Sequence, residues 1–412
     1  MHDTQLYEQI LGLIKPWHVT AVALNHTERA LEVRVDCGEQ VWACPTCNER
    51  MHVHGYEERR WRHLNTCQYQ TIIVSRVPRV SCSTHGTQMV RVPWAEKHSR
   101  FTCLFERFAI DVLQECSQKA AGEILGISWD EADGIKQRAV NRGLARKQWH
   151  VPTTVCFDEK AAGRGHDYVT VVTRVEAGRA MVDDVIDGRD TAAANAYWER
   201  FPAAELAAVA AVGMDMWQPY FESAVAHVPD AAEKIVHDRY HLVTYLNAAL
   251  DEVRRDEHAC LLARGDRRLN GTRRWWLYGK EHLARRVWRH FKALTASTLK
   301  TAKAWLYKEL FREMFSCPTR AAAEAYFKEW YRAVMRSRLY PMIKVAQMFK
   351  RHVANIMTWF THHLSNSFSE GINNLIQSLI KKAYGYRNRE RLRRDILFHA
   401  GALDLYPVLT IQ

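Results

Sequence analysis

The sequence predicts a multidomain α+β protein in which β-rich and helical segments alternate. Its 412 residues correspond to two to four domains, at about 150 residues per domain. Hydrophobic residues alternate along some segments and recur at helical spacing along others. The hydrophobic fraction of 47%, the 14 Trp and the lack of any apolar run near the length of a membrane span argue against a disordered or membrane-spanning chain. We therefore expect a soluble globular protein with several hydrophobic cores.

The charge balance favours a polyanionic partner. The chain carries 58 Lys plus Arg against 46 Asp plus Glu, a net charge of +12, which suits nucleic acid, although many basic proteins bind none. Residues 1–17 lack the features of a secretory signal, so we expect a cytoplasmic location. In a reducing compartment, the ten cysteines suit metal binding or burial better than a disulfide framework.

Residues 1–97 are predicted to form a β-rich domain. Residues 18–37 alternate in polarity around a turn-like centre and predict a hairpin, and residues 69–80 predict a further strand. Two ligand pairs, each with two intervening residues, accompany these strands: Cys44 with Cys47, and Cys82 with His85. Two such turns can present four ligands to one tetrahedral ion. We therefore expect a zinc ribbon with a structural Zn²⁺.

Other residues near these pairs leave alternatives open. His52, His54 and Cys67 could replace a ligand, and Cys37 is a weaker alternative. Buried cysteines beside a surface histidine would be the simplest explanation without any metal.

Residues 98–150 are predicted to form a helix-turn-helix domain. Apolar residues recur at helical spacing, one helix ends at Gly126, and Ser128 is the expected N-cap of the next helix, which begins near Trp129. In such a motif the second helix contacts DNA. We name Ser128 and the residues Lys136, Gln137 and Arg138, expected to be exposed, as candidate DNA-binding residues.

The following residues strengthen this interpretation without excluding another. Arg142, Arg146 and Lys147 form a basic tail directly after these candidates, as expected for phosphate contact. The alternative is a helical linker that packs on its neighbours.

Residues 151–256 predict an α/β sheet of the ribonuclease-H-like order. Three strands are expected at 153–158, 168–175 and 180–186, followed by alternating helices and strands up to residue 238. Strand signals are absent from residues 257–360, so we expect an all-helical insertion there. Residues 361–412 are expected to return to the catalytic domain with basic C-terminal helices.

The insertion begins with a strongly basic stretch. Residues 261–292 interleave aromatic and basic side chains, a mixture that suits phosphate contact and base stacking. Arg273 and Arg274 are candidate DNA-binding residues. Core tryptophans with a solvated charged face explain most individual positions more simply.

Three carboxylates could meet in the predicted sheet. Asp158 ends the first strand and Asp215 the fourth, which would be adjacent and parallel, and Glu370 lies on a late helix. Cleavage of phosphodiesters with two metal ions needs such converging carboxylates, although the chain offers 46 acidic residues. Glu159 should point to the opposite face of the strand from Asp158, and Asp183 and its neighbour Asp184 are expected on a solvated strand end.

The helix after Glu370 has two distinct parts. An apolar stripe that includes Ile372, Ile376 and Leu379 should pack on the sheet. Its far end is basic, and phosphate contact is one explanation and an ordinary solvated face the other. The candidate DNA-binding residues there are Lys381, Lys382, Arg387 and Arg389.

Several of these runs together resemble the ISL3 family of bacterial insertion-sequence transposases. The runs are FDEKAAGRGHDYVTVV from Phe157, GMDMWQPY around Asp215, VHDRYH ending at His241, and SEGINNLIQSLIKKAYGYRN from Ser369. The resemblance extends to the cysteine pairs and the helix-turn-helix, and so covers nearly the whole chain. One departure is the closing zinc pair, which is Cys82 with His85 where the family often has two cysteines.

The resemblance implies a DDE transposase whose catalytic domain is interrupted between its second and third acids. Asp158, Asp215 and Glu370 would bind Mg²⁺ or Mn²⁺, with Asp238 and His241 supporting the active site, although Asp238 could simply cap a helix. Such an enzyme would act on double-stranded DNA, both terminal inverted repeats and target, as a homodimer or higher homo-oligomer. Two alternatives stay open: a zinc and helix-turn-helix regulator with an inactive scaffold, and a nuclease without strand transfer.

Overall fold

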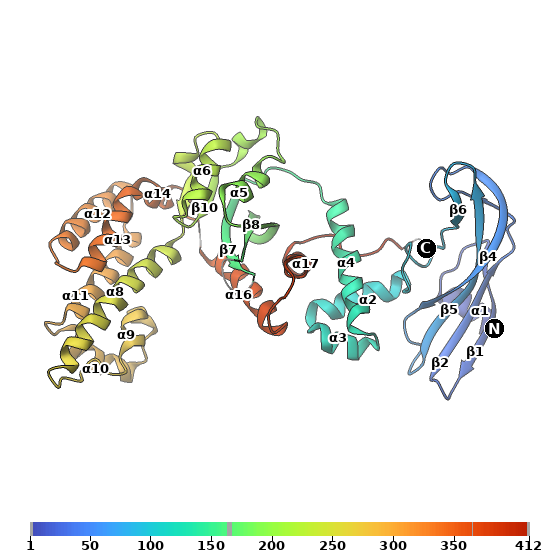
Figure 1. Ribbon diagram of the computed structural model, residues 1–412, viewed down its shortest axis with the longest axis horizontal. Helices are drawn as coiled ribbons and strands as arrows, with labels where there is room; N and C mark the ends of the chain where they lie inside the picture. Colours follow the sequence, from blue (N-terminus) through green and yellow to red (C-terminus); the bar gives the residue numbers. More distant parts are fainter. Residues whose placement is uncertain (1–2, 163–166, 365, 410–412) are drawn as a thin grey trace. The chain divides into compact units, whose positions relative to one another are not determined.

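The computed structural model describes residues 3–162, 167–364 and 366–409, except for the side chains at 280 and 366–369. It divides into two compact units, which Figure 1 colours along the chain. Unit 1 contains the residues up to Gln148 and the C-terminal segment from Ala402, and unit 2 runs from Trp149 to Gly401. Each unit combines a mixed sheet with helices, which confirms the predicted fold class.

A six-stranded sheet forms the N-terminal part of unit 1, in the order β1-β2-β5-β4-β3 with β6 beside β5. The predicted hairpin is confirmed as the antiparallel pair β1 and β2, and β2 also pairs in parallel with β5. Alternate residues of β2 are buried and pack with three tryptophans, Trp17, Trp61 and Trp94. The elements are α1 (Asp3–Ile10), β1 (Trp17–Asn25), β2 (Ala30–Cys37), β3 (Val41–Ala43), β4 (Arg50–Arg62), β5 (Gln70–Cys82) and β6 (Gly86–Met89).

The helix-turn-helix is formed by α3 (Gln118–Leu125) and α4 (Trp129–Arg146), which pack on α2 (Cys103–Glu115). Gly126 ends α3 in a left-handed conformation with a φ of 66°, which glycine adopts without a steric penalty. Ser128 caps α4 by accepting a hydrogen bond from the Glu131 N–H, while the Glu131 carboxylate accepts one from the Ser128 N–H. This capping box confirms the predicted start of the second helix.

The C-terminal segment packs against α2 and α4 of unit 1. Leu405 is buried, Arg142 donates a hydrogen bond to its carbonyl, and Arg146 donates one to the carbonyl of Tyr406 over 2.7 Å. The Tyr406 hydroxyl donates to Asp111 over 2.6 Å. We expected residues 361–412 to form one piece of the catalytic domain. The structure instead divides them after Gly401, because arginines of the helix-turn-helix bind the backbone of the last segment.

A five-stranded mixed sheet in the order β11-β10-β7-β8-β9 forms the centre of unit 2. The strands β7, β8 and β9 are antiparallel neighbours, whereas β7, β10 and β11 are parallel. This is the predicted ribonuclease-H-like order. The strands are β7 (Thr154–Ala161), β8 (Tyr168–Glu176), β9 (Arg179–Asp187), β10 (Ala211–Met214) and β11 (Ile235–His237), and the helices between them are α5 (Thr191–Trp198), α6 (Gln218–His227) and α7 (Ala231–Lys234).

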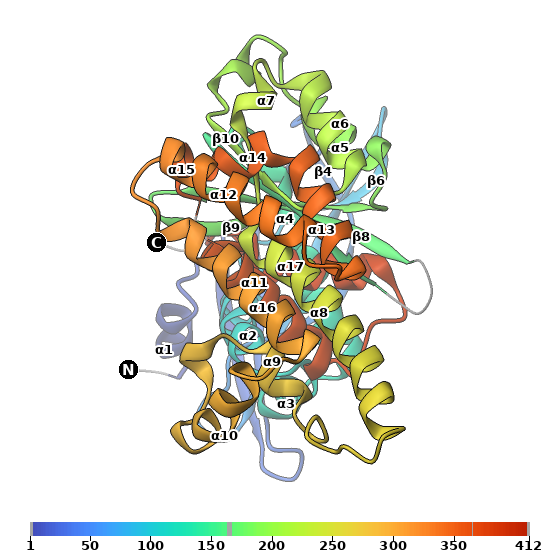
Figure 2. The same cartoon turned by 90° about the vertical axis from the view of Figure 1, so that its left-hand side faces the viewer.

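A helical insertion separates β11 from the last two helices. The long helix α8 packs along α11 and α13 (Figure 2), and Trp276, Phe291 and Phe311 are completely buried in its core. No described helix is both long and apolar enough to cross a membrane. The helices are α8 (Arg239–Leu262), α9 (Arg273–Leu277), α10 (Arg285–Thr295), α11 (Lys300–Glu313), α12 (Arg320–Met335), α13 (Tyr340–Arg351), α14 (Val353–Met357) and α15 (Trp359–His362).

The last helices of unit 2, α16 (Asn366–Lys382) and α17 (Arg389–Ala400), pack on β9. Ile372, Ile376 and Leu379 of α16 are buried, which confirms the predicted apolar stripe. Asp183 and Asp184 of β9 are buried as well, so the expectation that these two residues lie on a solvated strand end was wrong.

Helices pack on this part of β9, and its acids need cationic or hydroxyl partners. Asp183 accepts a hydrogen bond from the Tyr197 hydroxyl over 2.8 Å. Asp184 forms ion pairs with Arg200 and with Arg393, the latter at 3.3 Å.

Candidate active site and metal-binding cluster

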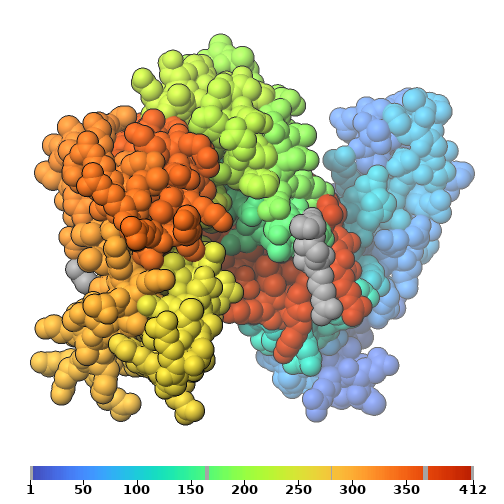
Figure 3. All heavy atoms as spheres, turned by 60° about the vertical axis from the view of Figure 1, so that its left-hand side comes forward, coloured from blue at the N-terminus to red at the C-terminus, as the bar shows by residue number. Residues whose placement is uncertain are grey.

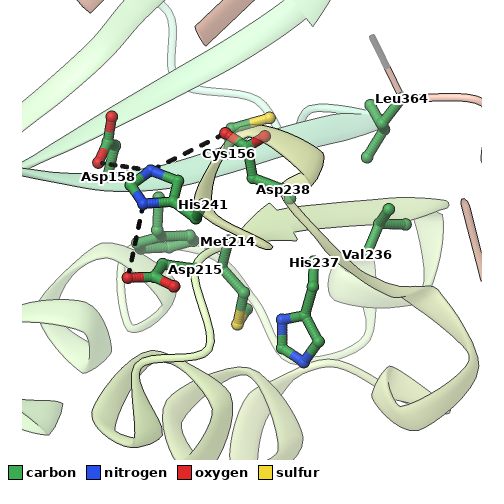
Figure 4. Close-up of a pocket in the computed structure, with 11 residues that line it drawn as sticks. Cys156, Asp158, Met214, Asp215, Val236, His237, Asp238, His241 and Leu364 are labelled. Carbon is green, nitrogen blue, oxygen red and sulfur yellow. Dashed lines mark ion pairs between the residues drawn. The ribbon is translucent and has the colours of Figure 1, made fainter. Parts of the chain in front are cut away.

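Three carboxylates of unit 2 meet at the carboxyl ends of its parallel strands. In the strand register Met214 of β10 is opposite Phe157 of β7 and His237 of β11. Each of these three residues is followed by an aspartate, so Asp158, Asp215 and Asp238 lie at the same edge of the sheet. All three acids line one pocket (Figure 4). Asp158 lies inside β7 rather than at its end, since this strand continues to Ala161.

His241 lies at the centre of these acids. Its Nε2 atom is 3.9 Å from Asp158 Oδ1 and 3.9 Å from Asp238 Oδ2, and its Nδ1 atom is 3.8 Å from Asp215 Oδ2. Figure 4 shows the imidazole between the carboxylates. Three acids therefore face this point of the pocket, and their combined field attracts cations there.

Asp238 combines the two roles that the sequence left open. Its carboxylate accepts a hydrogen bond from the Tyr240 N–H over 2.8 Å and so caps α8. The same side chain lines the pocket, where burial raises the pKa of its carboxyl. The cap fixes the first turn of α8 and thereby the position of His241.

Two further residues hold the catalytic candidates in place, and the sequence did not reveal them. The Tyr245 hydroxyl, one turn after His241 on α8, lies 3.3 and 3.4 Å from the two carboxylate oxygens of Asp215. The Asn373 amide of α16 donates a hydrogen bond to Asp158 Oδ2. A search at helical spacing after His241 and Glu370 could have found both, because residues three or four apart share a helix face.

Glu370 is exposed on α16 and is not among the described residues that line the pocket. It precedes Asn373 by three positions and therefore shares its helix face. Since Asn373 contacts Asp158, the structure brings the helix that carries Glu370 to the pocket. In the space-filling view, a hollow separates the yellow end of α8 from the red segment that includes α16 (Figure 3).

Glu159 has a separate partner, as its position on the strand predicted. Its carboxylate binds Arg189, with distances of 3.1 and 3.2 Å to the two oxygens. The guanidinium of Arg189 also lies over the rings of Tyr168 and Trp217. Glu159 is thus neutralised within the fold and does not contribute to the pocket.

The pocket suits a hard divalent cation. Asp158 and Asp215 provide oxygen ligands of the kind that Mg²⁺ prefers, and Glu370 could add a third. His241 shows that the carboxylates already accommodate a group that can carry positive charge. The donor set therefore fits Mg²⁺ or Mn²⁺, and ions held by such carboxylates activate and stabilise the oxygens of a phosphodiester.

Unit 1 contains a second potential metal site, formed by the four residues that the sequence predicted. The ligand atoms of Cys44, Cys47, Cys82 and His85 all lie within 4.8 Å of one another. The Sγ atoms of Cys47 and Cys82 are 3.7 Å apart, and Cys82 Sγ is 3.4 Å from His85 Nδ1. Tetrahedral Zn²⁺ with bonds near 2.3 Å to sulfur and 2.05 Å to nitrogen gives separations of about 3.8 and 3.6 Å.

The electrostatics of this cluster also suit a metal. Backbone hydrogen bonds from Cys47 and Thr46 lower the pKa of the Cys44 thiol to about 6, which favours the thiolate that binds metal. The alternative ligands His52, His54, Cys67 and Cys37 are not part of the cluster found among the described residues. The arrangement indicates a structural zinc site.

The helix-turn-helix candidates differ from expectation in their exposure. Lys136 is only 3% exposed, so its description as an exposed residue was wrong. Arg138 donates to the buried Glu106 over 2.8 Å, and Arg142 binds Glu96 and Glu106. These cations stabilise unit 1, because α4 presents this face to α2. Gln137 is exposed and bonds Asn141, and Ser128 is engaged in the cap.

The basic candidates of unit 2 fall into two groups. Arg273 is paired with Asp251 at 3.1 Å and Arg389 with Asp167 at 2.5 Å. The exposed group without an ion pair to any described residue consists of Arg274, Lys381, Lys382 and Arg387. The second group is the more accessible to an external phosphate.

Comparison with known families matches three segments of the chain. Residues 155–396 match the transposase domain of the ISL3 family of DDE transposases. Residues 40–85 match the zinc finger of the transposases of IS204, IS1001, IS1096 and IS1165. Residues 90–140 match the helix-turn-helix domain of transposase family ISL3. The zinc cluster and the capped start of α4 thus lie inside the matching segments.

Two similar proteins extend over most of the chain. One is the transposase for insertion sequence element IS1001 of Bordetella parapertussis, which is 26% identical over 88% of this chain and 89% of its own length. The other is the transposase for insertion sequence element IS1557 of Mycobacterium tuberculosis, which is 25% identical over 95% of this chain and 94% of its own length. Together with the match across the catalytic unit, these similarities show that the chain belongs to the ISL3 family of DDE transposases.

Proposed function

We propose that this transposase binds the terminal inverted repeats of its insertion sequence and catalyses metal-dependent cleavage and transfer of DNA strands. The convergence of Asp158 and Asp215 on adjacent parallel strands carries the proposal. The contact from Asn373 to Asp158 supports it, since it holds the helix of Glu370 at the same pocket.

Asp158, Asp215 and Glu370 would hold Mg²⁺ or Mn²⁺, which would supply activation of the attacking oxygen and stabilisation of the leaving one. Tyr245 and Asn373 fix the orientation of two of these carboxylates through hydrogen bonds. The supporting pair acts at the same place: Asp238 orders the first turn of α8, and this turn places the imidazole of His241 between the acids.

Recognition of the repeats is assigned to unit 1. The zinc ribbon and the helix-turn-helix would hold the repeat sequence, with Gln137 as the exposed candidate of α4. Ser128 would act by capping α4. Lys136 and Arg138 would act through the packing of that helix. Two ends must be processed together, so we infer a homodimer or a higher homo-oligomer on DNA.

Sequence-independent affinity is assigned to the accessible cations of unit 2. Arg274, Lys381, Lys382 and Arg387 would contact phosphates directly, whereas Arg273 and Arg389 would first have to exchange their carboxylate partners. Binding should therefore weaken steeply as the salt concentration rises.

The test compares wild type with Glu370→Gln on a labelled duplex that carries one end of the insertion sequence. We expect wild type to cleave in Mg²⁺ and the variant to bind the duplex equally well but to lose cleavage by a factor of at least a hundred. Equal cleavage by both proteins would remove Glu370 from the metal site.

Two other outcomes separate the alternatives. Tight repeat binding without cleavage by wild type would favour a regulator with an inactive scaffold. Cleavage without joined products on a supercoiled target would favour a nuclease.

A further inference from the structure

Helix α10 in the insertion presents a purely cationic face. Its inner side buries Phe291 completely, against Trp276 and Trp305. No Asp or Glu occurs between His282 and Lys308, so acidic side chains do not interrupt the outer side. The exposed basic side chains of α10 are Arg285, Arg286, Arg289, His290 and Lys292.

The arginines and the lysine of this face lack the carboxylate partners that several other cations of the insertion have among the described residues. Arg268, Arg273 and Arg312 form ion pairs with Asp266, Asp251 and Glu281 respectively. No described residue forms an ion pair with Arg285, Arg286, Arg289 or Lys292. Like charges on one helix face repel each other unless a polyanion offsets them, so this face fits the phosphate backbone of a nucleic acid.

Helix α8 sets the distance from the active site to this region. His241 lies in the pocket, and the same helix continues to Leu262, 21 residues later. At a rise of 1.5 Å per residue this part of α8 spans about 32 Å. Figure 1 shows α8 leading from the sheet towards α9 and α10. Because α8 packs along α11, and α11 contacts α10, the spacing is built into one unit.

This spacing corresponds to about nine base pairs of B-form DNA at 3.4 Å per pair. A duplex whose scissile phosphate lies in the pocket could therefore reach α10 slightly less than one helical turn away. Two duplex arms leave that phosphate, one within the insertion sequence and one in the flanking DNA.

The chemistry of α10 favours the flanking arm. Its exposed polar side chains are Arg, Lys and His, with neither Asn nor Gln to read adenine through paired hydrogen bonds, so direct reading by this face would be limited largely to guanine. Flanking DNA differs in sequence at every insertion site and must be held by its phosphates. We propose that the cationic face of α10 binds the backbone of the DNA that flanks the insertion sequence, about nine base pairs from the cleaved bond. This proposal rests on the proposed function.

The experiment removes three charges from this face, with Arg285, Arg286 and Arg289 all changed to Ala. The matched control changes Lys328, Arg332 and Arg336 to Ala. These residues are also exposed in the insertion, but acidic residues, Glu324 and Glu329, occur in the same part of the chain on α12. Both variants and wild type cleave end duplexes with either 3 or 20 base pairs of flanking DNA. Thermal unfolding of each protein shows whether it is folded.

We expect the α10 variant to show at least a tenfold higher KM on the long-flank duplex, with kcat unchanged, and to match wild type on the short-flank duplex. The salt dependence of long-flank binding should become shallower by about 2.7 in log–log slope, at about 0.9 per phosphate contact. The control should behave like wild type on both duplexes.

Three results would overturn the inference. Equal losses on both duplexes would place the contact on the repeat arm or show a structural role. No loss on either would make α10 an ordinary solvated face, and a loss shared by the control would make the effect one of net charge. If wild type cleaves neither duplex, the proposed function fails. Binding can still be measured in that case: if wild type binds the long-flank duplex more tightly than the short-flank one, and only the α10 variant loses this difference, the surface is a DNA contact.

Discussion

Tyr245 acts on the active site through Asp215, since its hydroxyl lies within 3.4 Å of both carboxylate oxygens. We predict that Tyr245→Phe lowers cleavage about tenfold to a hundredfold, the usual cost of losing a group that orients a metal ligand. The lost hydrogen bond frees the carboxylate to rotate, so the Mg²⁺ concentration needed for half-maximal cleavage should rise. A Mg²⁺ titration of cleavage measures both effects.

Tyr240→Phe is the matched control, because Tyr240 is on the same helix but is 61% exposed. It should titrate like wild type. If Tyr245→Phe lowered cleavage with an unchanged Mg²⁺ requirement and weaker DNA binding, Tyr245 would be a DNA contact rather than a positioning residue.

At this scale, local pattern predicted some residues and failed for others. Asp158 and Asp215 follow buried apolar runs, and strand order alone brings such positions together. Helical spacing after His241 and Glu370 marks Tyr245 and Asn373 as candidates, but their contacts depend on how two helices meet the sheet. Lys136 was misplaced because its exposure depends on which face of α4 packs inward.

The zinc cluster connects two turns of the N-terminal sheet that are distant in sequence. Cys44 and Cys47 lie between β3 and β4, whereas Cys82 ends β5 and His85 precedes β6. We predict that Cys44→Ser releases the Zn²⁺ and lowers the stability of unit 1, because a hydroxyl is a much weaker zinc ligand than a thiolate. Native mass spectrometry measures the metal content, and thermal unfolding measures the stability.

Cys67→Ser provides the control, since Cys67 is exposed and outside the cluster. It should retain one Zn²⁺ per chain. Full metal content in Cys44→Ser would contradict the assignment of this ligand.

Element-scale features were predicted best where a periodic pattern coincided with a turn signal. The β1–β2 hairpin and the capped start of α4 are examples. The basic stripe of α4 was predicted less well. Arg138, Arg142 and Arg146 suggested DNA contact, but they bind acids and carbonyls of unit 1. Charge in a sequence does not reveal whether a partner lies inside the fold.

For the molecule as a whole, unit 1 is completed by the end of the chain. Leu405 is 3% exposed, and its segment receives hydrogen bonds from two arginines of α4. We predict that Leu405→Asp lowers the free energy of unfolding of unit 1 by roughly 3 kcal/mol, because it places an unpaired carboxylate in an apolar site. Repeat binding should fall with it, and thermal unfolding with a gel-shift assay measures both.

Val408→Asp serves as the control for this change, since Val408 is 65% exposed. It should unfold and bind like wild type. Unchanged repeat binding in a Leu405→Asp protein of normal stability would show that the segment is dispensable for unit 1.

The return of the chain to unit 1 was not predictable from sequence periodicity. Residues 402–409 form neither a helix nor a strand, and only the side chains of distant helices hold them. The family match of the catalytic part ends at residue 396, before this segment begins.

This arrangement makes the completion of unit 1 a late event in the synthesis of the protein. A ribosome releases Leu405 only after it has translated the whole of unit 2, so the growing chain cannot complete unit 1 earlier. A product that terminates early would lack the buried leucine and the carbonyls that bind Arg142 and Arg146. Under the proposed function, such incomplete chains would bind the ends of the insertion sequence more weakly than chains that include residues 402–409.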